Sequence, residues 1–315
     1  MPTPIITDGS MDRLVRAPKV VLPKDQGLFA ERASRFDQLA AESSGMGDYM
    51  RLLAQVCRAQ SAAFKARTAH SVSERAIANS REHGMPPLSA HVFPRDESWH
   101  IDLRDIVAAV QQDAGAMTPE VTATLKALRT LAETDHESLD AIADRLIAGD
   151  SLVEDGSSIP FVGAALQVYF TRLASTLKAD SVSNCDVASV CPCCGMRPTA
   201  SLVRIDPDRL NYRYLVCSLC MTEWNMERVR CSSCESEKDV AYMAIESNDK
   251  PGLGQAVSAE TCDSCKTYLK IFSQEKDALV DPIADDLNSL ALDLLVDEKG
   301  YARTGPNLLF YPGHV

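Results

Sequence analysis

The sequence predicts an α+β protein: an N-terminal all-α domain, two tandem four-cysteine modules of the rubredoxin or zinc-ribbon kind, and a C-terminal helix. Two observations lead to this prediction. Apolar residues recur at helical spacing through the first 180 residues, and strand-like segments alternate with four Cys-x-x-Cys pairs farther on. The predicted divisions are an irregular arm over 1–24, a helical domain over 25–180, a metal domain over 185–275, and a helix with a docking tail over 276–315.

The first helices are predicted from apolar periodicity and from recognisable ends. One helix begins near Gln26, and Asp48 is placed to cap a second. A third, short helix fits Ser73 to His83, where Gly84 ends it.

The later helices carry clearer signals. Asp102 is predicted to begin a helix, and residues 118–120 (Thr-Pro-Glu) combine a hydroxyl cap, a first-turn proline and an acid at the positive end of the helix dipole. Another helix fits 137–148 and stops at Gly149. Segment 159–177 is apolar nearly all round, which predicts a place at the centre of the helical domain.

The segment from Cys191 to Cys265 repeats one plan twice. Each unit runs as a cysteine turn, a strand, a loop, a strand, a second cysteine turn and a third strand. A three-stranded sheet of this size buries too little apolar surface to fold alone, so metal binding is expected to supply part of its folding energy. The expected strands are 201–205, 212–216 and 223–230 in the first unit, and 240–245, 256–260 and 267–272 in the second.

Eight cysteines are the candidate metal ligands. Two Cys-x-x-Cys turns complete a tetrahedral four-sulfur site that suits zinc or iron and leaves no open position for catalysis. The spacing favours sharing between consecutive turns; an interleaved arrangement, or a site made by the two middle turns, is the alternative. Two metal ions are therefore expected, with the ligands Cys191, Cys194, Cys217, Cys220, Cys231, Cys234, Cys262 and Cys265.

The residue after the second cysteine of each turn affects its regularity. Gly195 occupies this place in the first turn, and glycine tolerates the left-handed backbone of a metal knuckle. Met221, Glu235 and Lys266 occupy it in the other turns, which we therefore expect to be less regular.

Three cysteines fall outside the pairs. Cys193 lies between two ligands and is interpreted as a spacer pointing away from the ion, or alternatively as a reactive spare thiol. Cys57 is interpreted as a small core residue of the second helix. Cys185, in the linker, is interpreted as an unused thiol that can in principle substitute as a ligand.

The end of the chain predicts one more helix and a docked tail. Asp281 is placed to cap this helix, with Pro282 in its first turn and Gly300 at its end. The tail over 307–313 is apolar and aromatic, so we expect it to dock. The apolar stripe of the helix is Ile283, Leu287, Leu290, Leu294 and Leu295.

Composition narrows the class of protein. The net charge is −12, which argues against a protein that tracks nucleic-acid phosphates and against binding to anionic membranes. Neither a signal peptide nor a membrane-spanning stretch is visible, so a cytoplasmic location is expected. Thiols stay reduced there, so the pairs are interpreted as metal ligands before disulfides. A redox dithiol is the weaker rival, because no βαβ pattern surrounds the pairs.

The cysteine segment and the tail together resemble the formate dehydrogenase accessory protein FdhE family. The resemblance covers about residues 185–313 and is weaker in the helical half. The residues that carry it are CPCCG, RYLVCSLCMTEWNMERVRCSSC, ETCDSCKTYLKIFSQEKD, DPIADDLNSLALD, GYAR and LLFYPG.

The resemblance implies a cytoplasmic, non-enzymatic protein that is needed to make active respiratory formate dehydrogenases. It implies a chaperone-like contact with their catalytic molybdenum and iron–sulfur subunit before export by the twin-arginine route. It also implies a rubredoxin-like cysteine domain that holds iron or zinc, with all eight ligand positions present.

The leading hypothesis is therefore a formate dehydrogenase maturation factor that binds the catalytic subunit. The protein is expected neither to bind nucleic acid nor to insert into a membrane. The sequence does not predict its oligomeric state. The absence of a phosphate-binding glycine loop, a nucleophile elbow or a dinucleotide fingerprint supports a binding protein. An iron electron carrier is a further alternative. So is a zinc-ribbon nucleic-acid or transcription-associated protein, which the local basic character of the first unit favours through Arg197, Arg204, Arg209, Arg213, Arg228 and Arg230.

Overall fold

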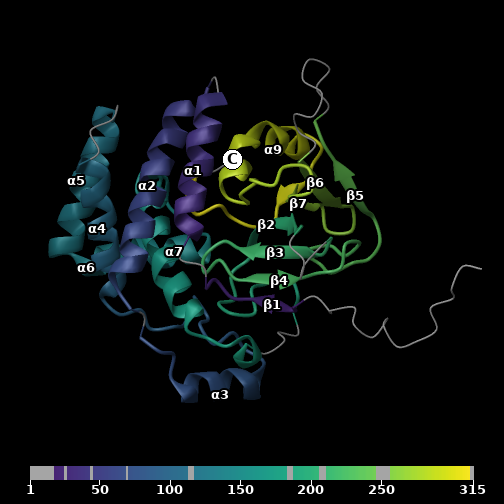
Figure 1. Cartoon of the computed structure of the whole chain (residues 1–315), viewed down its shortest axis with the longest axis horizontal. Helices are drawn as coiled ribbons and strands as arrows, with labels where there is room; N and C mark the ends of the chain where they lie inside the picture. Colours follow the sequence, from purple (N-terminus) through teal and green to yellow (C-terminus); the bar gives the residue numbers. More distant parts are fainter. Residues whose placement is uncertain are drawn as a thin grey trace, which may run out of the picture.

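Helices make up the first half of the chain and strands the second, as the sequence predicts. The computed structural model describes residues 18–24, 27–42, 45–68, 70–112, 117–182, 187–205, 211–245 and 256–312. Most helices of the first half lie on one side of the molecule and the sheet on the other, where α9 (Leu290–Asp297) covers the sheet (Figure 1). The helices of the first half are α1 (Leu28–Glu42), α2 (Gly47–Ala66), α3 (Glu74–His83), α4 (Ser98–Gln112), α5 (Pro119–Thr134), α6 (His136–Ala148) and α7 (Ile159–Ser175).

Several helix ends follow the chemistry expected from the sequence. The Ser73 hydroxyl accepts the backbone N–H of Ala76 at 3.2 Å, and Gly84 ends α3 with a φ of 63°. The Thr118 hydroxyl accepts the backbone N–H of Val121 at 3.3 Å and begins α5. These bonds satisfy groups that the helix itself leaves without partners.

Asp102 does not begin a helix, so this prediction is wrong. Helix α4 begins at Ser98, and Asp102 lies inside it, fully buried. Its carboxylate accepts hydrogen bonds from Arg172 at 2.8 and 2.9 Å and from Arg67 at 2.7 Å. An aspartate before an apolar run resembles a helix cap in sequence, but here Arg172 of α7 and Arg67, which directly follows α2, compensate its burial.

Helix α7 lies at the centre of the helical half. Nearly all its residues are buried, and it packs against α2, α4 and α6. The tail crosses it at Gly163, where an added Cβ would lie 2.1 Å from the carbonyl oxygen of Leu308. Leu308 and Leu309 are buried at this crossing. None of the helices in the described ranges is long and apolar enough to cross a membrane.

The strands of the two cysteine units join into one sheet. Within each unit the strands pair antiparallel, and β2 then pairs parallel with β7. The order is β1-β4-β3-β2-β7-β6-β5, with β8 also on β7. The strands are β1 (Val20–Val21), β2 (Pro198–Val203), β3 (Arg213–Cys217), β4 (Glu223–Asn225), β5 (Val240–Met243), β6 (Val257–Cys262), β7 (Thr267–Ser273) and β8 (Ala302–Arg303).

Several strands differ from the expectation: β2 begins at Pro198 rather than Ser201, and β8 was not expected. Strand β4 ends at Asn225 rather than near Arg230, because the buried Arg213 guanidinium draws in the carbonyls of Glu227 at 3.2 Å and Arg230 at 2.9 Å. Strand β1 lies in the segment expected to be an irregular arm, and it pairs with β4. Residues 1–17 of that arm lie outside the described residues.

The final helix is divided into α8 (Ala284–Asn288) and α9 (Leu290–Asp297). Asp281 caps the start as predicted, since its carboxylate accepts the backbone N–H groups of Ile283 and Ala284. The buried Lys270 ammonium donates to the carbonyls of Asp286 at 2.7 Å and Ser289 at 3.3 Å, and α8 ends there. The break leaves two leucines of the predicted stripe exposed, namely Leu294 and Leu295.

A buried charge cluster fastens these helices to the sheet. The Asp286 carboxylate pairs with Lys270 at 3.0 Å and Arg303 at 2.9 Å, and it accepts the Asn307 amide at 2.9 Å. Burial alone would raise the pKa of Asp286, but the two cations outweigh it and lower the pKa to about 2.

We expect Asp102→Ala to lower the free energy of unfolding by about 3–5 kcal/mol, because it leaves Arg172 buried without its counter-charge. The matched control is Asp37→Ala, which removes an exposed partner of Arg58 and should cost less than about 1 kcal/mol. Urea unfolding followed by circular dichroism measures both. Equal losses in the two variants would contradict the role assigned to Asp102.

Candidate metal centre

The structure brings the eight cysteines together in two groups of four. Within each group the sulfur atoms all lie within 4.8 Å of one another. The turns combine consecutively along the chain, which is the arrangement that the spacing favours. The first group contains Cys191, Cys194, Cys217 and Cys220, and the second contains Cys231, Cys234, Cys262 and Cys265.

The sulfur separations suit a tetrahedral ion. In the first group Sγ of Cys194 lies 3.3 Å from that of Cys217. In the second, Sγ of Cys231 lies 3.8 Å from that of Cys265. A tetrahedral ion with sulfur at about 2.3 Å places its ligands about 3.8 Å apart. Soft thiolates in this geometry can hold zinc or iron, so the residues present fit the ion that the sequence predicts.

All four turns share one backbone conformation. The residue after the second cysteine has a positive φ in each: 78° at Gly195, 57° at Met221, 62° at Glu235 and 55° at Lys266. The expectation that the three turns without glycine are less regular is therefore wrong. A left-handed conformation costs a non-glycine residue about 1 kcal/mol, so these side chains must offset it elsewhere.

Each of the three side chains contacts another part of the fold. Met221 Sδ accepts a hydrogen bond from Arg32 of α1 at 3.4 Å, and Glu235 accepts the backbone N–H of Ala188 at 2.6 Å. Lys266 Nζ lies 5.2 Å from the centre of the Tyr301 ring. Glycine at these three positions would relieve the strain of the left-handed backbone. The side chains that are present instead connect the cysteine turns to other parts of the fold.

The two groups differ in burial. All four cysteines of the first group are inaccessible to solvent and belong to the same apolar core as the helices. In the second group Cys234 is exposed and Cys265 is partly exposed. Burial raises the pKa of Cys231 to about 12. Burial also acts to raise the pKa of Cys265, but the Thr267 hydroxyl and neighbouring thiols outweigh it and lower this pKa to about 7.

A chain of buried amides connects the first group to the helices. Gln60 of α2 donates to the side-chain oxygen of Gln167 in α7 at 3.1 Å, and Gln167 donates to the Ser218 carbonyl at 2.9 Å. On another side, the backbone N–H of Leu88 donates to the Cys193 carbonyl at 2.9 Å. Neither glutamine was predicted as a functional residue; the one signal in the sequence is a polar residue within an apolar helical stripe.

The three remaining cysteines have different places. The Cys193 thiol is buried against Cys220 and Thr222, outside the group of four. Cys57 is fully buried in α2, where burial raises the pKa of its thiol to about 12, so it is a core residue as predicted. Cys185 lies outside the described residues.

We expect the full chain, loaded with two zinc ions, to release them to a chelator in two phases of similar size. The exposed second group should empty first, because the chelator reaches it without unfolding the core. A chromogenic zinc indicator measures both phases. Cys234→Ser should remove the fast phase and spare the slow one, and a single phase in the unaltered chain would contradict the difference in access.

Three family models together match nearly the whole chain. The model described as "FdhE, N-terminal" matches residues 17–186, "FdhE, central domain" matches 190–228, and "FdhE, C-terminal domain" matches 229–310. The second and third models each contain one of the cysteine groups.

Individual relatives agree with the family models. A protein FdhE homolog from Pseudomonas aeruginosa is 37% identical over 310 residues, which cover 98% of both chains. Protein FdhE from Salmonella enteritidis is 35% identical over 298 residues, covering 94% of this chain and 92% of the relative. The crystal structure of the FdhE protein from Pseudomonas aeruginosa superimposes with a TM-score of 0.82 at 38% identity, over 94% of this chain and 100% of that one. The chain therefore belongs to the FdhE family of formate dehydrogenase accessory proteins.

Proposed function

We propose that this protein is a cytoplasmic assembly factor that binds the catalytic subunit of a respiratory formate dehydrogenase before its export. The observation that carries the proposal is membership of the FdhE family along nearly the whole chain, helical half included. The protein would act as a chaperone that recognises an immature enzyme, and it would catalyse no reaction of its own.

We also propose that the eight clustered cysteines ligate two metal ions, zinc or iron. Each ion would cross-link two cysteine turns that lie at the ends of paired strands, so its binding energy would be folding energy. Four thiolates complete a tetrahedral shell and leave no position for a substrate, which supports a structural use over a catalytic one. Recognition of the catalytic subunit would then depend on the protein's side chains and not on the metal ions.

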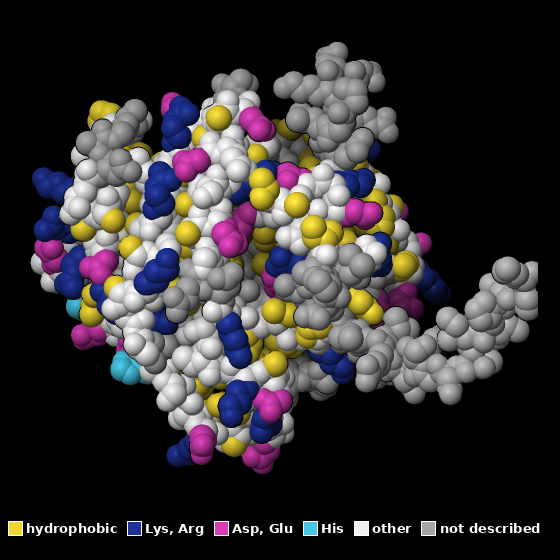
Figure 2. Space-filling model, viewed as in Figure 1, with side chains coloured by type: hydrophobic (Ala, Val, Ile, Leu, Met, Phe, Trp, Pro, Cys, Tyr) yellow, Lys and Arg dark blue, Asp and Glu magenta, His cyan; other side chains and the backbone are white. Residues whose placement is uncertain are grey.

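The arrangement of the arginines counts against the nucleic-acid alternative. Arg204 pairs with Glu223 at 3.0 Å, Arg213 is buried beside Glu260, and a third arginine pairs with Glu235. On the face shown in Figure 2, acidic and basic side chains are interspersed, without the single-sign stripe that phosphate binding needs. Arg209 lies outside the described residues.

Deletion and co-purification test this proposal together. Cells that lack the protein should lose formate dehydrogenase activity, and the affinity-tagged full chain should retain the catalytic subunit on the resin. Normal activity without the protein, combined with no association, would sink the proposal.

Cysteine variants separate the clusters from the rest of the chain. Cys194→Ser should fail to restore activity, because it opens the buried cluster. The matched control is Cys57→Ala, a change at a buried cysteine outside both groups, which should restore it. Full restoration by both variants would show that the first cluster is dispensable for the function.

A further inference from the structure

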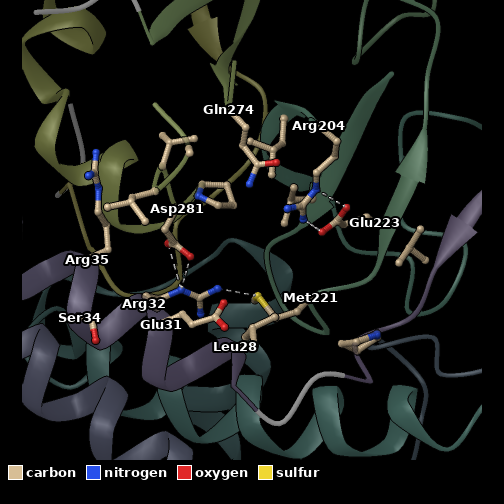
Figure 3. Close-up of a pocket in the computed structure, with 18 of the residues that line it drawn as sticks. Leu28, Glu31, Arg32, Ser34, Arg35, Arg204, Met221, Glu223, Gln274 and Asp281 are labelled. Carbon is tan, nitrogen blue, oxygen red and sulfur yellow. Dashed lines mark hydrogen bonds and ion pairs between the residues drawn. The ribbon is translucent and has the colours of Figure 1, made fainter. Parts of the chain in front are cut away.

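A groove separates α1 from the sheet, close to the first cysteine group but outside it. Its volume is about 590 Å³, within the range of sites that bind small ligands and short peptides. Figure 3 shows the side chains of α1 on one side of the open space and those of the strands on the other, with the segment after β7 completing the wall.

Arg32 lies at the inner wall of this groove with its hydrogen bonds incomplete. The residue is 1% exposed. Its Nε donates to Asp281 at 3.1 Å, and its Nη2 donates at 3.4 Å to the sulfur of Met221, a weak and neutral acceptor. Its Nη1 is buried and has no partner among the described residues. A buried donor without an acceptor is costly, so a ligand that opens this inner wall and brings an oxygen to Nη1 would be favoured.

The charges along the groove agree with an anionic ligand. The lining contains Lys24, Arg32, Arg35 and Arg204 against Glu31, Glu223 and Asp281, in a chain whose net charge is −12. Arg204 is occupied by Glu223, and Arg35 by Asp277 and Asp285 outside the lining. The lining cations that can still pair with an anionic ligand are therefore Arg32, at the inner wall, and Lys24, which is exposed.

Other lining residues suit a peptide. Leu28 of α1 is partly exposed and Leu279 is 62% exposed, so both offer apolar surface. Gln274 directs its side-chain amide into the open space between Asp281 and Arg204, where it can pair with a peptide group (Figure 3). An acyl chain would leave this amide without a partner.

We propose that the groove binds an extended peptide segment of a partner protein, with apolar side chains next to a carboxylate. The carboxylate completes the donor set of Arg32, and the apolar side chains cover Leu28 and Leu279. The proposal is independent of the assembly role, because synthetic peptides test it without any formate dehydrogenase.

Met221 provides a local probe, because its sulfur contacts Arg32. We would label the methionine methyl groups of the full chain with ¹³C and assign the Met221 signal with Met221→Leu. The probes are acetyl-Leu-Val-Leu-Asp-amide, the same peptide with Asn in place of Asp, and octanoate. The Asp peptide should shift the Met221 signal saturably, with an affinity at least about ten-fold above that of the Asn peptide, and octanoate should give no saturable shift.

Rim variants keep the test valid if changes at the buried Arg32 unfold the chain. Leu279→Ser should weaken the Asp peptide several-fold. The matched control Leu294→Ser changes a leucine of similar exposure, 69%, outside the groove, and should leave binding unchanged. Equal binding of the Asp and Asn peptides, no movement of Met221, or octanoate binding as tightly as the peptide would each overturn the proposal.

Discussion

The structure depends on the burial of the first four-cysteine group within the core of the helices. Its four sulfurs are inaccessible to solvent, and they pack in the same apolar cluster as α2, α4 and α7. Gln167 and Arg32 extend from the helices to the turn at 217–221. The first cysteine unit therefore shares one apolar core with the helices. The geometry of its turns determines how the helical half packs against the sheet.

The second group has the same turns in a different setting. Its sheet joins the first through the parallel pairing of β2 with β7, while Cys234 remains exposed. The left-handed backbone at Glu235 and Lys266 shows that the turn geometry is kept even where glycine is absent. Repetition of the motif therefore does not imply repetition of its role: one group lies inside the core, and the other lies at the surface.

The sequence predicted several of the features that local chemistry decides, but the cap expected at Asp48 is wrong, because α2 begins at Gly47 and Asp48 lies in its first turn. The Ser73, Thr118 and Asp281 caps follow from nearby residues, and the consecutive combination of the cysteine turns follows from their spacing. Features that depend on distant residues were missed. Asp102 is buried by arginines far along the chain, and the carbonyls at the break between α8 and α9 are taken by Lys270 of a strand. Periodicity contains no information about such partners.

Hydrogen exchange of α7 tests the central claim most directly, because exchange there requires the core to open. Full chains carrying Cys194→Ser or Cys234→Ser would be compared with the unaltered chain under one zinc-loading protocol. The account predicts that α7 amides lose protection in Cys194→Ser and keep it in Cys234→Ser. Equal protection of α7 in both variants would show that the helical core stands without the buried cluster, and would contradict the account.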